Sequence, residues 1–154
     1  MLFLIITVIV FNLIAYFIPK RISPIELLAT TLFASYLQIL TDVYLGLKYH
    51  LYGYFDKGVD WDTLLYIFGI YPAINVIFLN YYPYGKTLYK QAIYILCWSI
   101  LAMVYETIFI WSGTFYLNGW KQDYSVIVYP ILYTILMVFH SVTIRCIKKS
   151  KENK

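Results

Sequence analysis

The sequence predicts an all-α integral membrane protein: a bundle of five transmembrane helices with the N-terminus outside and the C-terminus in the cytoplasm. Three observations favour this fold class. The 154 residues are 62% hydrophobic and only 13% charged, about half the charged fraction of roughly 25% found in soluble domains. The mean hydropathy is +0.69. Five apolar stretches approach the roughly 20 residues that a helix needs to cross a bilayer.

The five stretches form one transmembrane domain, and their approximate bounds are 2–18, 25–47, 63–82, 91–111 and 125–144. Hydrocarbon offers the backbone no hydrogen-bond partner, so stretches of this length are expected to be helices. The first has no basic residue before it and no small-residue cleavage site after it, which favours a retained helix over a signal peptide. Residues 145–154 are expected to form a basic, polar cytoplasmic tail.

Basic residues are distributed unequally between the two sides of this bundle. With the N-terminus outside, only Lys48, Lys57 and Lys121 lie in outer segments. The other nine lie in cytoplasmic segments: Lys20, Arg21, Lys86, Lys90, Arg145, Lys148, Lys149, Lys151 and Lys154. Basic residues concentrate in cytoplasmic loops, so this bias sets the orientation. The net charge of +4 then reflects topology, and we expect no nucleic-acid partner.

The two longer outer segments, "YHLYGYFDKGVDWD" and "GTFYLNGW", are rich in aromatic residues. Aromatic rings with polar tips favour the headgroup layer, so these rings form either an interfacial belt or an interaction surface. The candidate outer interaction surface consists of Tyr52, Phe55, Asp56, Asp60, Trp61 and Trp120. The aspartates do not have the spacing of a calcium loop, and we expect no metal and no cofactor.

Polar residues inside the stretches recur at helical spacing. The second stretch places Thr31, Ser35, Gln38 and Asp42 on one face, and the fourth places Ser99, Ala102 and Glu106 on one face. Hydrogen bonding between helices explains most such positions, but a carboxylate inside a span is functional by default. The alternatives are a surface pair of Asp42 with Lys48 and a buried structural hydrogen bond for Glu106.

Asp42 and Glu106 are expected at nearly the same depth. A rise of about 1.5 Å per residue places them roughly 25 Å and 22 Å from the cytoplasmic ends of their helices. We therefore predict an outward-facing intramembrane site made by Asp42, Glu106, Gln38 and Tyr105, with Tyr44 as a further hydrogen-bond donor. It would bind a proton, a cation or the polar head of a ligand. The alternative is that the two helices are not neighbours and each acid is satisfied separately.

Other chemistry is sparse in the sequence. No catalytic or phosphate-binding motif is present. Cys97 and Cys146 fall on the cytoplasmic half, where a disulfide is not expected. His140 is expected to form a hydrogen bond between helices. The chain is therefore more readily interpreted as a binding or interaction protein than as an enzyme.

Several segments resemble an uncharacterised family of small multi-span membrane proteins from spore-forming bacilli and clostridia. The resemblance covers nearly the whole chain and rests on "YFIPKRIS", "TDVYLGLKYHLYGYFDKGVDW", "GIYPAINVIFLN", and "YLNGWKQDYS" followed by "YP". The chain departs from the family pattern in "FYLNGW", where the family has a second tyrosine before the asparagine. The resemblance implies a bacterial plasma membrane or spore membrane, but it brings no activity and no site residue.

Three functions are compatible with these patterns. The first is an accessory or interaction protein whose partners are the lipid bilayer, another membrane protein or a second copy of the chain. The second is a small proton- or cation-coupled carrier that uses Asp42 and Glu106. The third is a lipid-acting membrane enzyme with the same two acids as general acid and base.

Overall fold

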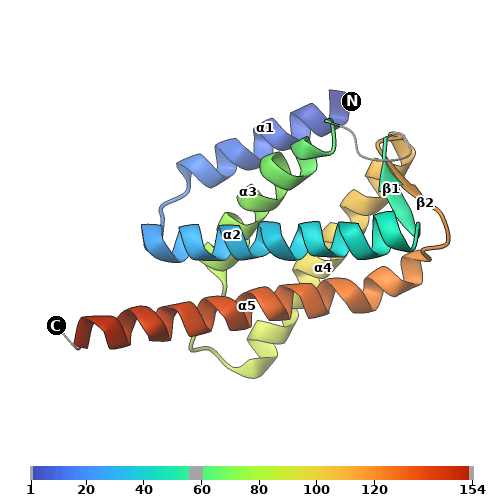
Figure 1. Cartoon of the computed structure of the whole chain (residues 1–154). Coiled ribbons are helices and arrows are strands. Elements are labelled where there is room, and N and C mark those ends of the chain that lie inside the picture. The colour runs from blue at the N-terminus through green and yellow to red at the C-terminus, as the bar shows by residue number, and fades with distance from the viewer. Residues whose placement is uncertain (1, 56–60, 153–154) are drawn as a thin grey trace.

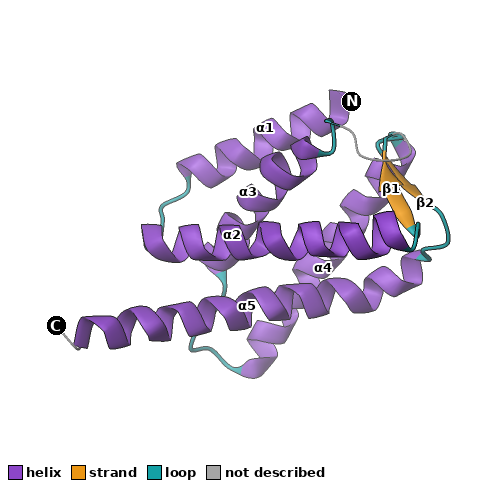
Figure 2. Cartoon of the chain, viewed as in Figure 1, coloured by secondary structure: helices purple, strands orange, loops and turns teal. Residues whose placement is uncertain are grey.

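The computed structural model describes residues 2–55 and 61–152, and it folds them mainly into helices with a small sheet at one end (Figures 1 and 2). The prediction of a mainly helical fold with five helical segments is confirmed. The helices are α1 (Leu2–Phe17), α2 (Pro24–Thr41) continued by the π-helix η1 (Asp42–Lys48), the π-helix η2 (Leu65–Ile70) continued by α3 (Tyr71–Tyr81), α4 (Leu88–Trp111) and α5 (Gln122–Glu152). The strands are β1 (Tyr52–Tyr54) and β2 (Phe115–Leu117).

The largest departure from the predicted boundaries is at the end of α5. The helix continues to Glu152, so most of the predicted tail, 145–154, is helical. Lysine and arginine are good helix formers, and basic residues in the last turn interact favourably with the helix dipole. Lys149 and Lys151 occupy that turn.

Within residues 2–55 and 61–152, three helices are long and apolar enough to cross a membrane: Pro24–Lys48, Leu88–Trp111 and Gln122–Glu152. The other two predicted spans are shorter apolar helices, Leu2–Phe17 and Leu65–Tyr81. The 16 residues of α1 extend about 24 Å at 1.5 Å per residue, less than a hydrocarbon core about 30 Å thick.

Polar and apolar side chains are distributed in the reverse of the usual soluble pattern. Large apolar side chains on the outer faces are exposed, among them Ile9, Leu32, Leu96 and Ile127. The buried polar side chains are Thr7, Thr30, Asn75, Asn80, Ser99, Glu106, Thr114, Ser125 and His140. Soluble proteins bury few such groups and expose more charge. Helices that pack against one another in lipid turn small and polar residues toward their neighbours, as these helices do.

The molecule has two distinct ends. The N-terminus lies at the same end as β1 and β2, and the C-terminus lies at the opposite end (Figure 1). We call the first the cap end and the second the tail end. At the tail end, Lys20 donates to the carbonyls of Ala15, Tyr16 and Ile18. This cation therefore satisfies carbonyl groups that the last turn of α1 leaves free.

The sheet joins two links that are far apart in sequence. β1 and β2 pair antiparallel, with Gly53 opposite Tyr116. The carbonyl of Leu51 accepts from the backbone N–H groups of Asn118 and Trp120 at 2.8 and 3.0 Å. The link after η1 is thus fixed to the link between α4 and α5. Three-residue strands carry too little alternation to be predicted from sequence, and the helix-only prediction missed them.

Close packing of α1 depends on a glycine. The missing side chain of Gly69 leaves room for Val8, since a Cβ on Gly69 would lie 3.0 Å from a Val8 methyl carbon. Asn12 donates to the Gly69 carbonyl at 2.7 Å. α1 is therefore fixed to η2 by one close approach and one polar contact.

Candidate functional site

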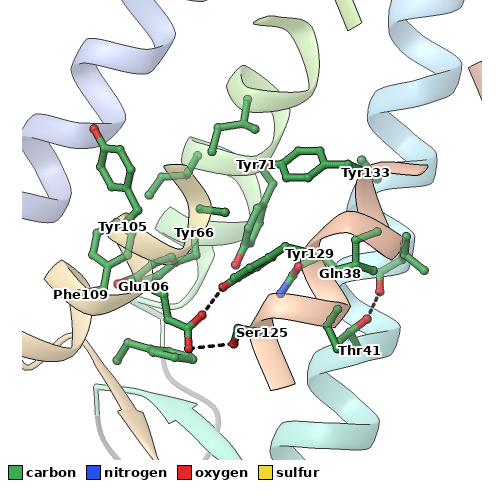
Figure 3. A pocket seen from close by; sticks show the side chains of 18 of the residues that line it. Gln38, Thr41, Tyr66, Tyr71, Tyr105, Glu106, Phe109, Ser125, Tyr129 and Tyr133 are labelled. Carbon is green, nitrogen blue, oxygen red and sulfur yellow. Dashed lines mark hydrogen bonds between the residues drawn. The ribbon is translucent and has the colours of Figure 1, made fainter. Parts of the chain in front are cut away.

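A cavity of about 230 Å³ lies inside the bundle below the sheet. Side chains from α2, η2, α3, α4 and α5 line it, and most of them are aromatic or aliphatic (Figure 3). The aromatic part of the lining includes Tyr66, Tyr71, Tyr105, Phe109 and Tyr133. Glu106 is the one residue with a formal charge among the lining residues, all of which lie in the described part of the chain.

Glu106 is buried, with 6% of its surface exposed. Tyr129 donates to its Oε2 at 2.7 Å and Ser125 donates to its Oε1 at 3.1 Å, both from α5 (Figure 3). The indole N–H of Trp120 donates to Ser125 Oγ at 3.0 Å, so the Ser125 hydroxyl proton is free for Glu106. Among the described residues, the carboxylate is therefore held by neutral donors and has no basic partner.

Asp42 lies behind the cavity wall. Three residues that line the cavity donate to its Oδ1: Gln38 at 3.0 Å, Tyr52 at 2.9 Å and Tyr54 at 3.2 Å. Its Oδ2 is buried and accepts no hydrogen bond within the described part of the structure. Asp42 is also the point at which α2 changes to the π-helix η1, and π-helical segments within helices are frequent at functional sites.

The structure therefore brings together most of the residues predicted for the intramembrane site. Gln38 bonds Asp42 directly, and Tyr105 and Glu106 line the same cavity as Gln38. Each carboxylate nevertheless has its own donors, as in the alternative of separate satisfaction. Tyr44 is exposed rather than bonded to an acid.

The proposed surface pair of Asp42 with Lys48 is replaced by other contacts. Lys48 Nζ lies 5.3 Å from the ring centroids of both Tyr44 and Tyr49. This arrangement is a cation–π contact at the surface. Asp42 meanwhile turns toward the neutral donors that hold it inside the bundle.

Aromatic residues of the candidate outer surface divide into two groups. Tyr52 and Trp120 line the cavity and stack edge to face at 6.0 Å, and Phe55 packs near Tyr66. Trp61 is 87% exposed. Asp56 and Asp60 lie outside the described residues. Tyr52 and Trp120 thus cover the cap end of the cavity, and we call these two side chains the roof.

Tyr52 is suited to act as a permanent donor in this roof. Burial, and then the charge of Asp42, raise the pKa of the Tyr52 phenol well above its usual range. The hydroxyl therefore stays protonated and keeps donating to Asp42 at any ordinary pH.

A third carboxylate, Glu26, lies at the tail end. Its Oε2 is 3.0 Å from Nε2 of His140, and Ser23 donates to its Oε1 at 2.7 Å. The Tyr84 hydroxyl bonds the other ring nitrogen of His140, which is fully buried. This cluster joins α2, α5 and the link between α3 and α4.

Sequence reasoning missed Glu26, Ser125 and Tyr129, although signals for them were present. Ser23 and Glu26 have the spacing of a capping box, and a buried histidine in a span requires a partner. Ser125 and Tyr129 continue, four residues at a time, the polar face that includes Tyr133.

No known family model, no curated protein and no solved structure matches this chain.

Proposed function

We propose that the protein is a membrane-embedded binding protein that takes a small organic cation into the cavity. One observation supports this most strongly: Glu106 is buried in the cavity wall, and none of the lining residues, all within the described chain, is Lys, Arg or His. A buried carboxylate without a cationic partner is costly. A cationic ligand supplies the missing charge.

The lining favours an organic cation over a strongly hydrated inorganic ion. Aromatic faces attract cations, most strongly when both are desolvated. Tyr66, Tyr71, Tyr105 and Tyr133 offer such faces next to aliphatic side chains. An apolar body on the ligand would fill the rest of the space, as in most small-molecule sites.

Calorimetric titration of the protein in lipid nanodiscs with 2-phenylethylammonium tests this proposal. We expect saturable binding that Glu106→Gln weakens at least tenfold, because the amide removes the charge while keeping the size. Asp123→Asn is the matched control, since Asp123 is an exposed carboxylate near the same end of the molecule. Unaltered binding by Glu106→Gln would refute the proposal.

We place this binding protein across a bacterial plasma membrane, or a spore membrane, with all five helices spanning, the N-terminus outside and the C-terminus in the cytoplasm. The exposed apolar faces support insertion, and the two termini at opposite ends support an odd number of crossings (Figure 1). A reporter that fluoresces only in the cytoplasm, fused after Lys154, should fluoresce. A stable but dark fusion would contradict this orientation.

The carrier function uses the same cavity and adds movement of the cation across the membrane. Proteoliposomes loaded with buffer test it. Time-dependent uptake of labelled 2-phenylethylammonium, lost in Glu106→Gln, would support a carrier. Binding without uptake would restrict the protein to a receptor or accessory role.

A second candidate is an interaction function at the cap, and the exposure of Trp61 specifically favours it. Large aromatic residues are enriched where proteins meet. A photo-crosslinker at position 61 should then join the chain to another membrane protein or to a second copy in intact membranes. Crosslinks to lipid alone would assign Trp61 to the headgroup layer.

A further inference from the structure

Two asparagines on α3 are buried almost completely but differ in how their amides are satisfied. Asn80 accepts from the Arg21 N–H at 2.6 Å and donates to the Pro19 carbonyl at 3.0 Å. Asn75 is 1% exposed, and its Nδ2 donates to Thr31 Oγ1 at 3.1 Å. Asn75 lines the cavity, and within the described part of the chain its Oδ1 has no partner.

Neighbouring hydroxyl groups fix which end of the Asn75 amide faces α2. Thr30 donates its proton to the Glu26 carbonyl at 2.7 Å. Its oxygen can therefore only accept, and Asn75 Nδ2 lies 3.4 Å from it. Turning the amide over would exchange the Nδ2 contact with Thr30 for a contact between two acceptors, whereas the Thr31 hydroxyl, which can donate or accept, fits either orientation. Oδ1 is thus the atom left without a donor.

A buried acceptor without a donor is uncommon and unfavourable. Most buried polar atoms in native proteins have a partner, and each exception requires an explanation. Leaving such an acceptor unpaired costs the full desolvation of the group. A ligand that brings its own N–H to Asn75 removes this penalty, whereas a ligand without one leaves it in place.

We infer that the cavity selects ammonium ions that carry at least one N–H, with the N–H donating to Asn75 Oδ1 and the positive charge facing Glu106. This inference rests on the proposed function and names the chemical class of its ligand. Primary amines in their protonated form are the best fit, because they carry three N–H groups. Quaternary ammonium ions have equal charge and no donor.

A series of ligands with one body separates donor recognition from charge recognition. We would titrate the protein in nanodiscs with 2-phenylethylammonium and with its N,N-dimethyl and N,N,N-trimethyl derivatives. Affinity should fall along the series, with the primary ammonium at least tenfold tighter than the trimethyl ion. Asn75→Leu, which keeps the size but removes the acceptor, should reduce this ratio to about twofold or less.

Asn80→Leu is the matched control, because it removes an equally buried asparagine whose partners are all within the chain. It should lower stability but keep the ratio. If Asn75→Leu does not fold, Asn75→Ala replaces it, and the wild-type series needs no variant. A trimethyl ion that binds as tightly as the primary one would overturn the inference. A tenfold ratio that remains in the Asn75 variant would also overturn it, because the larger size of the trimethyl ion would then explain the ratio. If no member of the series binds, the proposed function itself fails.

Discussion

The two ends of the bundle treat a buried carboxylate differently. At the tail end, Glu26 has an ionisable partner, His140, and a serine donor, and His140 is itself held by Tyr84. At the cap end, the partners of Glu106 within the described part of the chain are the hydroxyl groups of Ser125 and Tyr129, and it faces a cavity.

This difference separates a structural carboxylate from one with unused binding capacity. A paired and fully bonded acid joins helices, because breaking the pair leaves its partner buried alone. An acid held by neutral donors has no positive counter-charge beside it among the described residues, so the surroundings favour a cation. Replacing the glutamate is therefore expected to lower stability at the tail end and to weaken ligand binding at the cap end.

The largest expected effect comes from replacing each glutamate by glutamine. Glu26→Gln should lower the free energy of unfolding by about 2 kcal/mol, because a charge-assisted hydrogen bond to a fully buried histidine is lost. Glu106→Gln should change it by less than about 0.5 kcal/mol, because the amide still accepts a hydroxyl proton and a desolvated charge is removed. Thermal unfolding in mild detergent, followed by circular dichroism, measures both.

Glu152→Gln, at the exposed end of α5, is the control for the change of residue type. Equal losses from Glu26→Gln and Glu106→Gln would break the distinction between the two ends. Reversed losses would assign the structural role to the cap end.

Two tyrosines offer an intermediate comparison. Tyr84→Phe removes a hydrogen bond from buried His140 and should cost about 1.5 kcal/mol. Tyr52→Phe should cost about 0.5 kcal/mol, because Gln38 and Tyr54 still donate to the same oxygen of Asp42. Denaturant titration of both variants checks the order. A larger loss for Tyr52→Phe would mean that the three donors to Asp42 are not redundant.

Sequence periodicity was sufficient for part of the site and insufficient for the rest. Spacing on two helices placed Asp42 and Glu106 at one end of the bundle, and both lie at the cap end. Their donors could not be assigned, because helical spacing gives the face of a residue but not which neighbouring helix meets that face. Tyr44 and Tyr105 were expected as hydrogen-bond donors. In the structure Tyr54 donates to Asp42, and Tyr129 donates to Glu106.

The roof of the cavity was not predictable from local pattern. Tyr52 and Trp120 lie 68 positions apart, and the sheet that joins their segments has three residues per strand. Their aromatic character suits either a membrane surface or a core. Only the pairing of β1 with β2 decides that these rings turn inward.

The smallest difference in stability between the two ends is expected for two serines that donate to carboxylates, one at each end. Ser23→Ala removes a helix cap and a 2.7 Å bond to Glu26, and Ser125→Ala removes a 3.1 Å bond to Glu106. Each should cost about 1 kcal/mol of stability, so stability does not distinguish them. Binding of 2-phenylethylammonium does. Ser125→Ala should weaken it about threefold, because ordering a side chain freed in this way costs roughly 0.6 kcal/mol, whereas Ser23→Ala should leave it within about twofold of wild type. Calorimetry on both variants in nanodiscs measures the difference, and equal affinities would show that Ser125 does not position Glu106 for the ligand.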